Sequence, residues 1–467
     1  MARQPNIILL VLDTARKDAL SIYGNKANTP FLDAFAADAV VFNNCIAPAP
    51  WTIPSHASFF TGKYPSEHGI DVTKEAKCLA LKRAMNQVST ETLPEFMSRK
   101  ASYNTVGFSA NYFVCPGSGF DRGFDIFNYR DVRGIEDNEM EIIDGELKNH
   151  EQGRKQIAWD LIKQGQIRNL AQLYLTYSRI KRRQKKLHYP LTKGGNEIVQ
   201  RIKEADLRDP FFLFANLMEL HEPYEKYEMD NWSFSLEDLF GLKEIPPFVL
   251  ERIKQRYYLV AGQLDSFFGR FIQELREKRL YDDSVIVVVS DHGQAFKEKN
   301  YYGHGLFLHD EIIQVPLMIK FPNNRKFQVK NGYQSLVDLP KLIHEVIEEG
   351  NVTNDTLTRD RAFSESFGIH YQFIPKGSGR EIHDVQRKAI FKDGYKLVLN
   401  LSNEAIEEFS YRGKPIEQNL MTSKKESLIE ELRASMQYTP EKREFVNPFA
   451  KEEELVILEN LHALGYS

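Results

Sequence analysis

The sequence predicts an α/β fold in which a large, mixed but mainly parallel sheet is flanked by helices. Two continuous apolar runs, 6–12 and 285–289, are typical of strands buried inside a parallel sheet. Strand patterns alternate with helix patterns through most of the chain, as a layered α/β fold requires. Near residue 375 the pattern changes to short strands and turns, which predicts a smaller C-terminal α+β subdomain.

Local residues mark the ends of several predicted elements. Thr29 and Pro30 have the order of an N-cap and a first-turn proline, and Pro54 and Gly62 bracket a second helix. Strands are expected at 6–12, 39–43, 103–109, 210–217, 283–290, 315–321, 386–391, 395–401 and 407–411. Helices are expected at 30–38, 54–61, 91–100, 247–278 and 336–348.

The 467 residues divide into one large domain and one small one. Residues 1–375 are expected to form the α/β domain, interrupted at 131–205 by a charged, largely helical insertion or lid. Residues 376–467 are expected to form an antiparallel subdomain, because Lys392-Asp393-Gly394 is a hairpin turn signal between two short strands.

Composition excludes several classes of protein and site. A net charge of -4 gives no basic excess, so nucleic acid is not expected as a partner. The 3 cysteines are scattered and predict neither a zinc site nor disulfides. No apolar run reaches the ~18 residues of a membrane-spanning helix, and the N-terminus lacks the cleavage region of a signal peptide. We therefore expect a cytoplasmic protein.

Polar residues follow two of the predicted buried strands. Asp13 ends the first apolar run, and Asp291 and His292 follow the run 285–289. Ligands of α/β sheets gather at the carboxyl ends of strands. A carboxylate beside an imidazole can hold a hard or borderline cation. The competing interpretation makes Asp13 a helix cap or turn residue, and Asp291 and His292 a solvated turn.

Thr52 and two histidines are further candidates. Thr52 lies at or just before a predicted helix N-terminus, where free backbone N–H groups favour a tetrahedral anion. A plain capping threonine is the competing interpretation. His221 follows strand 210–217, and His304 stands between two glycines that indicate a close backbone approach. Each is equally explained as a structural histidine.

Taken in order, these segments resemble the sulfatase branch of the alkaline phosphatase superfamily over nearly the whole chain. The resemblance implies an alkaline phosphatase-like fold, hydrolysis of an ester and a bound divalent metal. The matching segments are 6–13, 52–65 with His68 and Gly69, 221–224, 290–293, 303–311, 315–317, 336–340, 394–397 and 461–466.

The sequence departs from the sulfatase motif at two positions. Sulfatases carry Cys or Ser at the first position of this motif and Arg four residues later. A maturation enzyme oxidises the Cys or Ser to formylglycine. Here those positions are Thr52 and His56. Oxidation of a threonine would give a ketone, so we predict no formylglycine. A threonine nucleophile instead resembles the phosphodiesterases, phosphonate monoester hydrolases and phosphoglycerol transferases of the superfamily, and implies a covalent Thr52 intermediate.

The resemblance implies that Asp13, Thr52, Asp291 and His292 bind the metal. Sulfatases have a second aspartate directly after the first, where this chain has Thr14. They favour calcium sites built of oxygen ligands, whereas His292 brings an imidazole. This mixed nitrogen and oxygen set favours manganese or zinc over calcium.

One metal ion is expected rather than two. Bimetallic members of the superfamily use an Asp with a His four residues later, whereas Asp265 is followed at that spacing by Gly269. His56, His221 and His304 are then left to bind non-bridging oxygens or to protonate the leaving group. The sequence does not decide which of them is the general acid.

The predicted insertion contains a basic amphipathic segment at 168–187. Its apolar and aromatic residues recur at helical spacing and are followed by a run of Lys and Arg. Three roles remain open for it: packing on the domain, a subunit interface in a homo-oligomer, and contact with an anionic membrane surface.

The sequence therefore predicts a metal-dependent ester hydrolase. A phosphodiester or phosphonate monoester is favoured as substrate, either free or linked to a lipid or polymer. The alternatives are hydrolysis of a sulfuric ester, transfer of a phospho-headgroup to an alcohol, and an inactive binding protein. The natural substrate and the oligomeric state are not identified at this level.

Overall fold

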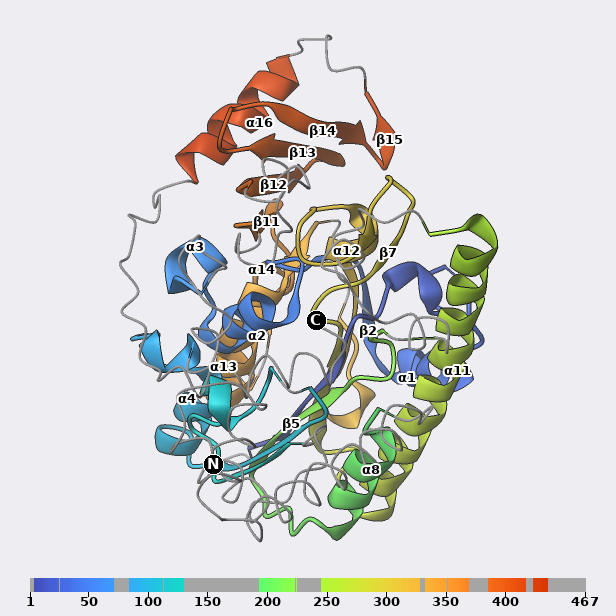
Figure 1. The fold of residues 1–467 in the computed structure, drawn as a ribbon. Coiled ribbons are helices and arrows are strands. Elements are labelled where there is room, and N and C mark those ends of the chain that lie inside the picture. Colours follow the sequence, from blue (N-terminus) through green and yellow to red (C-terminus); the bar gives the residue numbers. More distant parts are fainter. Residues whose placement is uncertain are drawn as a thin grey trace, which may run out of the picture.

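The computed structural model describes residues 4–24, 26–70, 84–111, 113–129, 193–222, 224, 245–327, 332–350, 352–368, 385–416 and 423–435. It confirms the predicted α/β fold. An eight-stranded sheet with the strand order β10-β2-β9-β6-β1-β5-β3-β4 forms the centre, and helices cover both of its faces (Figure 1). All pairings in this sheet are parallel except those of β9 with β2 and β6, so the sheet is mixed but mainly parallel.

The elements have the following bounds. The strands are β1 Asn6–Leu12, β2 Val40–Ile46, β3 Asn104–Ser109, β4 Ile126–Tyr129, β5 Phe211–Leu217, β6 Ser284–Val289, β7 Ala295–Phe296, β8 Tyr302–Gly303, β9 Gln314–Lys320, β10 Gln334–Ser335, β11 Arg361–Ser366, β12 Arg387–Lys392, β13 Tyr395–Asn400, β14 Ile406–Tyr411 and β15 Lys414–Pro415. The helices are α1 Pro30–Asp38, α2 Thr52–Thr61, α3 Pro65–His68, α4 Leu93–Arg99, α8 Gly195–Glu204, α11 Pro247–Glu277, α12 Asp310–Ile313, α13 Leu339–Glu349, α14 Asn354–Leu357 and α16 Ser423–Ala434. The short 3-10 helices are Lys17–Ala19, Ala84–Gln87, Pro116–Ser118, Pro322–Asn324 and Leu336–Asp338.

The continuous apolar run of β1 is explained by two cores, one on each face of the sheet. Ile7, Leu9 and Val11 belong to a core that also contains residues of α2, α4 and α13. The alternate residues Ile8 and Leu10 belong to a second core with residues of α1, α8 and α11. Successive side chains of a strand point to opposite faces, so a strand covered on both sides must be apolar throughout.

The register of three central strands determines where the polar strand ends meet. β1 lies between β6 and β5, with Val11 opposite both Val289 and Asn216. Two residues further along, Asp13 and Asp291 therefore emerge side by side at the carboxyl edge. The Asp13 N–H continues the ladder by donating to the carbonyl oxygen of Leu217 at 2.9 Å.

A five-stranded antiparallel sheet, β11 to β15, forms the C-terminal part, and α16 packs on β12 and β13. In Figure 1 this sheet and α16 lie at one end of the large domain. The predicted turn at Asp393 and Gly394 is present, with positive φ angles of 54° and 82°. The first strand of this sheet, β11, precedes residue 376, where the subdomain was expected to begin.

Two local expectations are corrected. Thr29 precedes α1, but its side chain makes no capping bond to the helix and contacts Ser21 instead. The predicted helix 54–61 begins at Thr52, two residues earlier. Of the predicted insertion at 131–205, only residues 193–205 belong to the described residues, and the basic segment 168–187 lies outside them. Among the described residues, no helix has the length and apolar character needed to cross a membrane.

Candidate active site

Asp13, Asp291 and His292 come together at the carboxyl edge of β1 and β6, as predicted. One ligand atom of each lies within 4.8 Å of the others, and all three side chains are fully buried. The Oδ1 atom of Asp291 accepts the N–H groups of Thr14 (3.2 Å) and His292 (2.9 Å). Its Oδ2 atom has no hydrogen-bond partner among the described residues and lies 3.5 Å from the Nε2 atom of His292. These ligand atoms therefore lie close enough together for one ion to contact all three.

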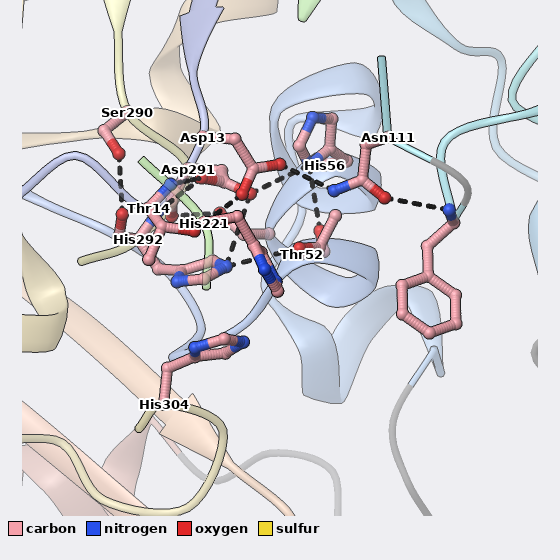
Figure 2. Close-up of polar contacts among 12 residues, drawn as sticks. Asp13, Thr14, Thr52, His56, Asn111, His221, Ser290, Asp291, His292 and His304 are labelled. Carbon is pink, nitrogen blue, oxygen red and sulfur yellow. Dashed lines mark hydrogen bonds and ion pairs between the residues drawn. The ribbon is translucent and has the colours of Figure 1, made fainter. Parts of the chain in front are cut away.

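Thr52 is the first residue of α2, and its side chain faces this cluster (Figure 2). Its Oγ1 atom lies 3.2 Å from the Nε2 atom of His292. The residue at the N-cap position is Trp51, which makes no side-chain capping bond, so the interpretation of Thr52 as a plain N-cap is wrong. The Ser55 hydroxyl donates to the carbonyl oxygen of Asp291 at 2.7 Å and ties α2 to the loop after β6.

The glycine after His292 is required by the packing of this loop. A Cβ atom on Gly293 would lie 2.2 Å from the carbonyl oxygen of Glu311, closer than any side chain tolerates. The Gly293 N–H donates to the Ile312 carbonyl oxygen at 2.6 Å. Glycine at this position therefore lets the loop after β6 pack against the backbone of residues 311 and 312.

Burial sets the ionisation of the cluster. Burial and the neighbouring Asp13 charge raise the pKa of Asp291 well above its ordinary value. Burial would also raise the pKa of Asp13, but attraction to His221 and His292 outweighs it and lowers this pKa to about 2. Burial lowers the pKa of His292, so its ring is neutral at pH 7 and offers a lone pair.

A divalent cation fits these residues. Two ligand atoms that each lie about 2.1 Å from one ion are at most about 4.2 Å apart. The distances from the His292 Nε2 atom to Thr52 Oγ1 and to Asp291 Oδ2 are both shorter than this limit. A cation would bind the unpartnered Oδ2 atom of Asp291 and balance the negative charge of the two adjacent carboxylates. Among the described residues, Asp291 forms ion pairs only with imidazoles, those of His56 and His292.

His56 has a different role from the predicted contact with substrate oxygens. Its Nδ1 atom donates to the carbonyl oxygen of Thr52 at 3.0 Å, and its Nε2 atom accepts from the Asn216 amide at 3.1 Å. The ring is fully buried, and burial lowers its pKa to about 4, so it is neutral at pH 7. His56 therefore does not replace the positive charge of an arginine; it positions the first turn of α2.

His304 lies next to both His292 and His221. The ring centroid of His304 is 4.5 Å from that of His292 and 5.2 Å from that of His221. Glu222 lies between them, with its Oε2 atom 3.6 Å from the Nδ1 atom of His221 and 3.8 Å from that of His304. Figure 2 shows both predicted histidines turned toward the Thr52 end of the site.

Sequence reasoning missed several polar residues around the site. Asn111 donates to the Oδ2 atom of Asp13 at 2.6 Å, and Asn216 donates to the same atom at 3.3 Å. Thr14 donates its hydroxyl to the Oδ1 atom of Asp13 at 2.7 Å. A signal for the two asparagines exists, since each stands at or just after the end of a parallel strand, β5 or β3.

Asp265, the aspartate considered for a second metal, has a structural role. Its carboxylate accepts the backbone N–H groups of Phe31 (3.0 Å) and Leu32 (2.8 Å) and so caps the start of α1. A second site built on Asp265 is therefore not formed.

Comparisons with known proteins identify the family of this chain. The family model named Sulfatase matches residues 5–347. An arylsulfatase of Clostridium perfringens is 26% identical over 355 residues, which cover 69% of each chain. An endo-4-O-sulfatase of Bacteroides thetaiotaomicron is 22% identical over 379 residues, 72% of this chain and 68% of that protein.

A solved structure extends the similarity of fold. The phosphonate monoester hydrolase of Silicibacter pomeroyi superposes with a TM-score of 0.62 at 17% identity, covering 93% of this chain and 96% of the other. Sulfatases and phosphonate monoester hydrolases of the alkaline phosphatase superfamily thus share this architecture. Because the family model matches well over half of its residues, this chain belongs to the sulfatase family and is an ester hydrolase.

Proposed function

We propose that this chain hydrolyses a phosphodiester or a phosphonate monoester through a covalent intermediate on Thr52. The observation that carries the proposal is the position of the Thr52 hydroxyl. It stands at the N-terminus of α2, 3.2 Å from the imidazole of His292 and against a pair of buried carboxylates. The secondary alcohol of threonine cannot be converted into the aldehyde that sulfatases use on sulfate.

Asp13, Asp291, His292 and Thr52 would hold one divalent metal ion. A bound ion supplies positive charge that favours the alkoxide form of the threonine and neutralises the oxygens of the ester. The neutral imidazole of His292 favours manganese or zinc over calcium.

The chain's own residues account for the course of the reaction. The Thr52 Oγ1 atom gives up its proton to solvent and attacks phosphorus, an O–P bond forms, and the bond from phosphorus to the leaving oxygen breaks as that oxygen takes up a proton to leave as the alcohol. The N–H groups of Thr52 and Ile53 at the start of α2 would face the anion, because Pro54 has no N–H and that of Ser55 donates to a carbonyl oxygen. His56 holds that turn by its hydrogen bond to the Thr52 carbonyl. Water then cleaves the phosphothreonine and restores the hydroxyl.

Sulfuric ester hydrolysis is the second candidate. Two sequence relatives with sulfatase names favour it, the arylsulfatase and the endo-4-O-sulfatase. It would have to proceed by direct attack of the Thr52 hydroxyl on sulfur, since we expect no formylglycine here.

Parallel assays separate the two candidates. Bis-aryl phosphate, aryl phenylphosphonate, aryl phosphate and aryl sulfate would be compared with Mn²⁺, Zn²⁺ and Ca²⁺. We expect the first two to be turned over fastest, and dominant sulfate turnover would overturn the proposal.

Variants of Thr52 test the nucleophile. Thr52→Ala should lower kcat by at least about 10³-fold, whereas Thr52→Ser should retain part of the activity because it keeps an alcohol. Mass spectrometry of the peptide that spans Thr52 should show no oxidation in the free enzyme. Activity that survives in Thr52→Ala would remove Thr52 as the nucleophile.

A further inference from the structure

Lys396 connects the C-terminal sheet to the large domain. It lies on β13, in the sulfatase-like segment 394–397, and is 3% exposed. Its Nζ atom donates to the Oδ1 atom of Asp310, the first residue of α12, at 2.7 Å and to the Oε2 atom of Glu408 on β14 at 2.9 Å. In Figure 1, α12 lies at the end of the large domain that faces the C-terminal sheet. The ion pair of Lys396 with Asp310 therefore joins the two parts of the molecule.

Both members of this pair keep their charge despite burial. Burial opposes the charge of Lys396, but Asp310 and Glu408 outweigh it and raise the pKa of Lys396 above its ordinary value. Burial also opposes the charge of Asp310, but Lys396 outweighs it and lowers the pKa of Asp310. Breaking the pair would leave a buried charge without its partner, so the pair holds α12 at a fixed position relative to β13.

α12 in turn holds the loop that carries His292. The Gly293 N–H donates to the carbonyl oxygen of Ile312 at 2.6 Å, and the Gln294 N–H donates to that of Glu311 at 3.1 Å. Both acceptors belong to α12, which has only 4 residues. So short a helix has little stability of its own, and its position is therefore set by its contacts.

The same helix contacts the segment that leads to Thr52. The Ala47 N–H, shortly before α2, donates to the carbonyl oxygen of Ile313 at 2.7 Å, and Ile313 is the last residue of α12. α12 therefore bonds to both arms of the site, the one that carries His292 and the one that carries Thr52. Its position bears on the distance of 3.2 Å between the Thr52 Oγ1 atom and the His292 Nε2 atom.

We propose that Lys396 is a positioning residue for the metal site. Its ammonium group acts through Asp310 and α12, which set how His292 and Thr52 face each other. The inference rests on the proposed function, in which these two residues bind a divalent cation together with the two strand-end aspartates. Residues that orient metal ligands typically change metal affinity by about 10–100-fold when they are replaced.

Amide hydrogen exchange measures this coupling without metal or substrate. Lys396→Met keeps an unbranched apolar side chain and removes the ammonium group, and Asp310→Asn breaks the same pair from the other side. In both variants, exchange should become about tenfold faster in peptides that contain Ala47, Gly293 and Gln294, because these N–H groups bond to α12. The peptide that spans β5 should exchange as in the wild type.

Binding of Mn²⁺ measures the effect on the site. Calorimetric titration should give a dissociation constant about tenfold higher for Lys396→Met and for Asp310→Asn than for the wild type. A purely electrostatic effect would shift the two affinities in opposite directions, because one variant loses a positive charge and the other a negative charge. The double variant should be no worse than either single variant, because the pair acts as one unit.

Lys392→Met is the matched control. Lys392 lies on the neighbouring strand β12 and pairs at 2.6 Å with Glu431 of α16, inside the C-terminal part of the chain. Its replacement removes a lysine from the same sheet without touching the link to α12. Hydrogen exchange around Ala47 and Gly293 and the affinity for Mn²⁺ should both stay at their wild-type values. Circular dichroism would confirm that each variant is folded.

The outcomes are distinct. Wild-type exchange and Mn²⁺ affinity in folded Lys396→Met or Asp310→Asn would overturn the inference, and so would opposite shifts in affinity or equal changes in Lys392→Met. Asp310→Asn leaves Lys396 paired with Glu408, so it provides the test if Lys396→Met does not fold. A wild type that binds no Mn²⁺ would instead refute the proposed metal site, and the exchange result would still decide the role of Lys396.

Discussion

Replacing Asp291 with asparagine should separate stability from activity. In the metal-free protein the Oδ1 atom of Asp291 accepts two backbone N–H groups, while Oδ2 is buried, unpartnered and 3.5 Å from the lone pair of His292 Nε2. Asparagine keeps the accepting oxygen and places an NH₂ group where Oδ2 stood. That group can donate to His292, and the negative charge beside Asp13 disappears.

The size of the effect follows from these contacts. A buried polar group left unsatisfied costs about 1–3 kcal/mol, so Asp291→Asn should raise the free energy of unfolding of the metal-free protein by about that amount. The wild type should gain about 2.7 kcal/mol from a cation at a hundred times its dissociation constant, and the variant should not gain it. The kcat of the variant should fall by at least about 10²-fold, because the metal ion proposed to bind Asp291 is lost.

The pH dependence has a defined sign. The pKa of Asp291 is raised in the folded state, so its protonated form stabilises the fold at low pH. That stabilisation is complete below the ordinary aspartate pKa and is lost as the pH rises through the folded value. The Asp291→Asn variant should not lose this stabilisation. The difference between its free energy of unfolding and that of the metal-free wild type should therefore grow with pH.

Urea unfolding followed by tryptophan fluorescence, with a chelator and then with Mn²⁺, measures these differences. Asp206→Asn is the control. The Asp206 side chain is 75% exposed, so the free energy of unfolding of this variant should stay within about 0.5 kcal/mol of that of the wild type. A metal-free Asp291→Asn protein less stable than the wild type would refute the reasoning. So would a variant that Mn²⁺ still stabilises.

Three other predictions concern the surroundings of the site. His56→Gln should lower kcat about tenfold with little change in KM, because His56 positions α2 and does not touch substrate; a changed KM with constant kcat in steady-state assays would contradict this role. Burial lowers the pKa of His56 to about 4 and those of His68 and His309 to about 3. Neutral buried histidines stabilise the fold above the ordinary histidine pKa, so acid unfolding curves should show the stability that these three histidines contribute falling as the pH drops below that value, and a flat profile would contradict their burial. Tyr257→Phe removes a hydroxyl that accepts the Arg16 N–H at 2.8 Å and donates to the loop after β1 at 3.0 Å, and should cost about 1–3 kcal/mol in urea unfolding; an unchanged midpoint would show that this loop does not depend on it.

The sulfatase-family site combines residues from strand ends and a helix start that lie far apart in the chain. β1 and β6 bring two carboxylates together through their parallel register, with Val11 opposite Val289. The first turn of α2 then adds the hydroxyl of Thr52. Because the site depends on how these three elements pack together, replacing Gly293 in the loop after β6 would disturb ligands that come from all of them.

The sequence by itself indicated most of the strands along the chain, the buried character of β1 and β6, and the polar residues Asp13, Asp291 and His292 at their ends. Those features are local, because a strand covered on both faces is continuously apolar and a polar residue at its end is visible in the same few letters. The hairpin at Asp393 is equally local.

Only the tertiary structure decided the rest. The capping of α1 by Asp265, the neutral and fully bonded ring of His56 and the meeting of Glu222 with His304 join residues that are distant in the chain. The ionisation of a side chain and the choice of its partner depend on what surrounds it in space and on how much water is excluded. A linear pattern does not contain that information.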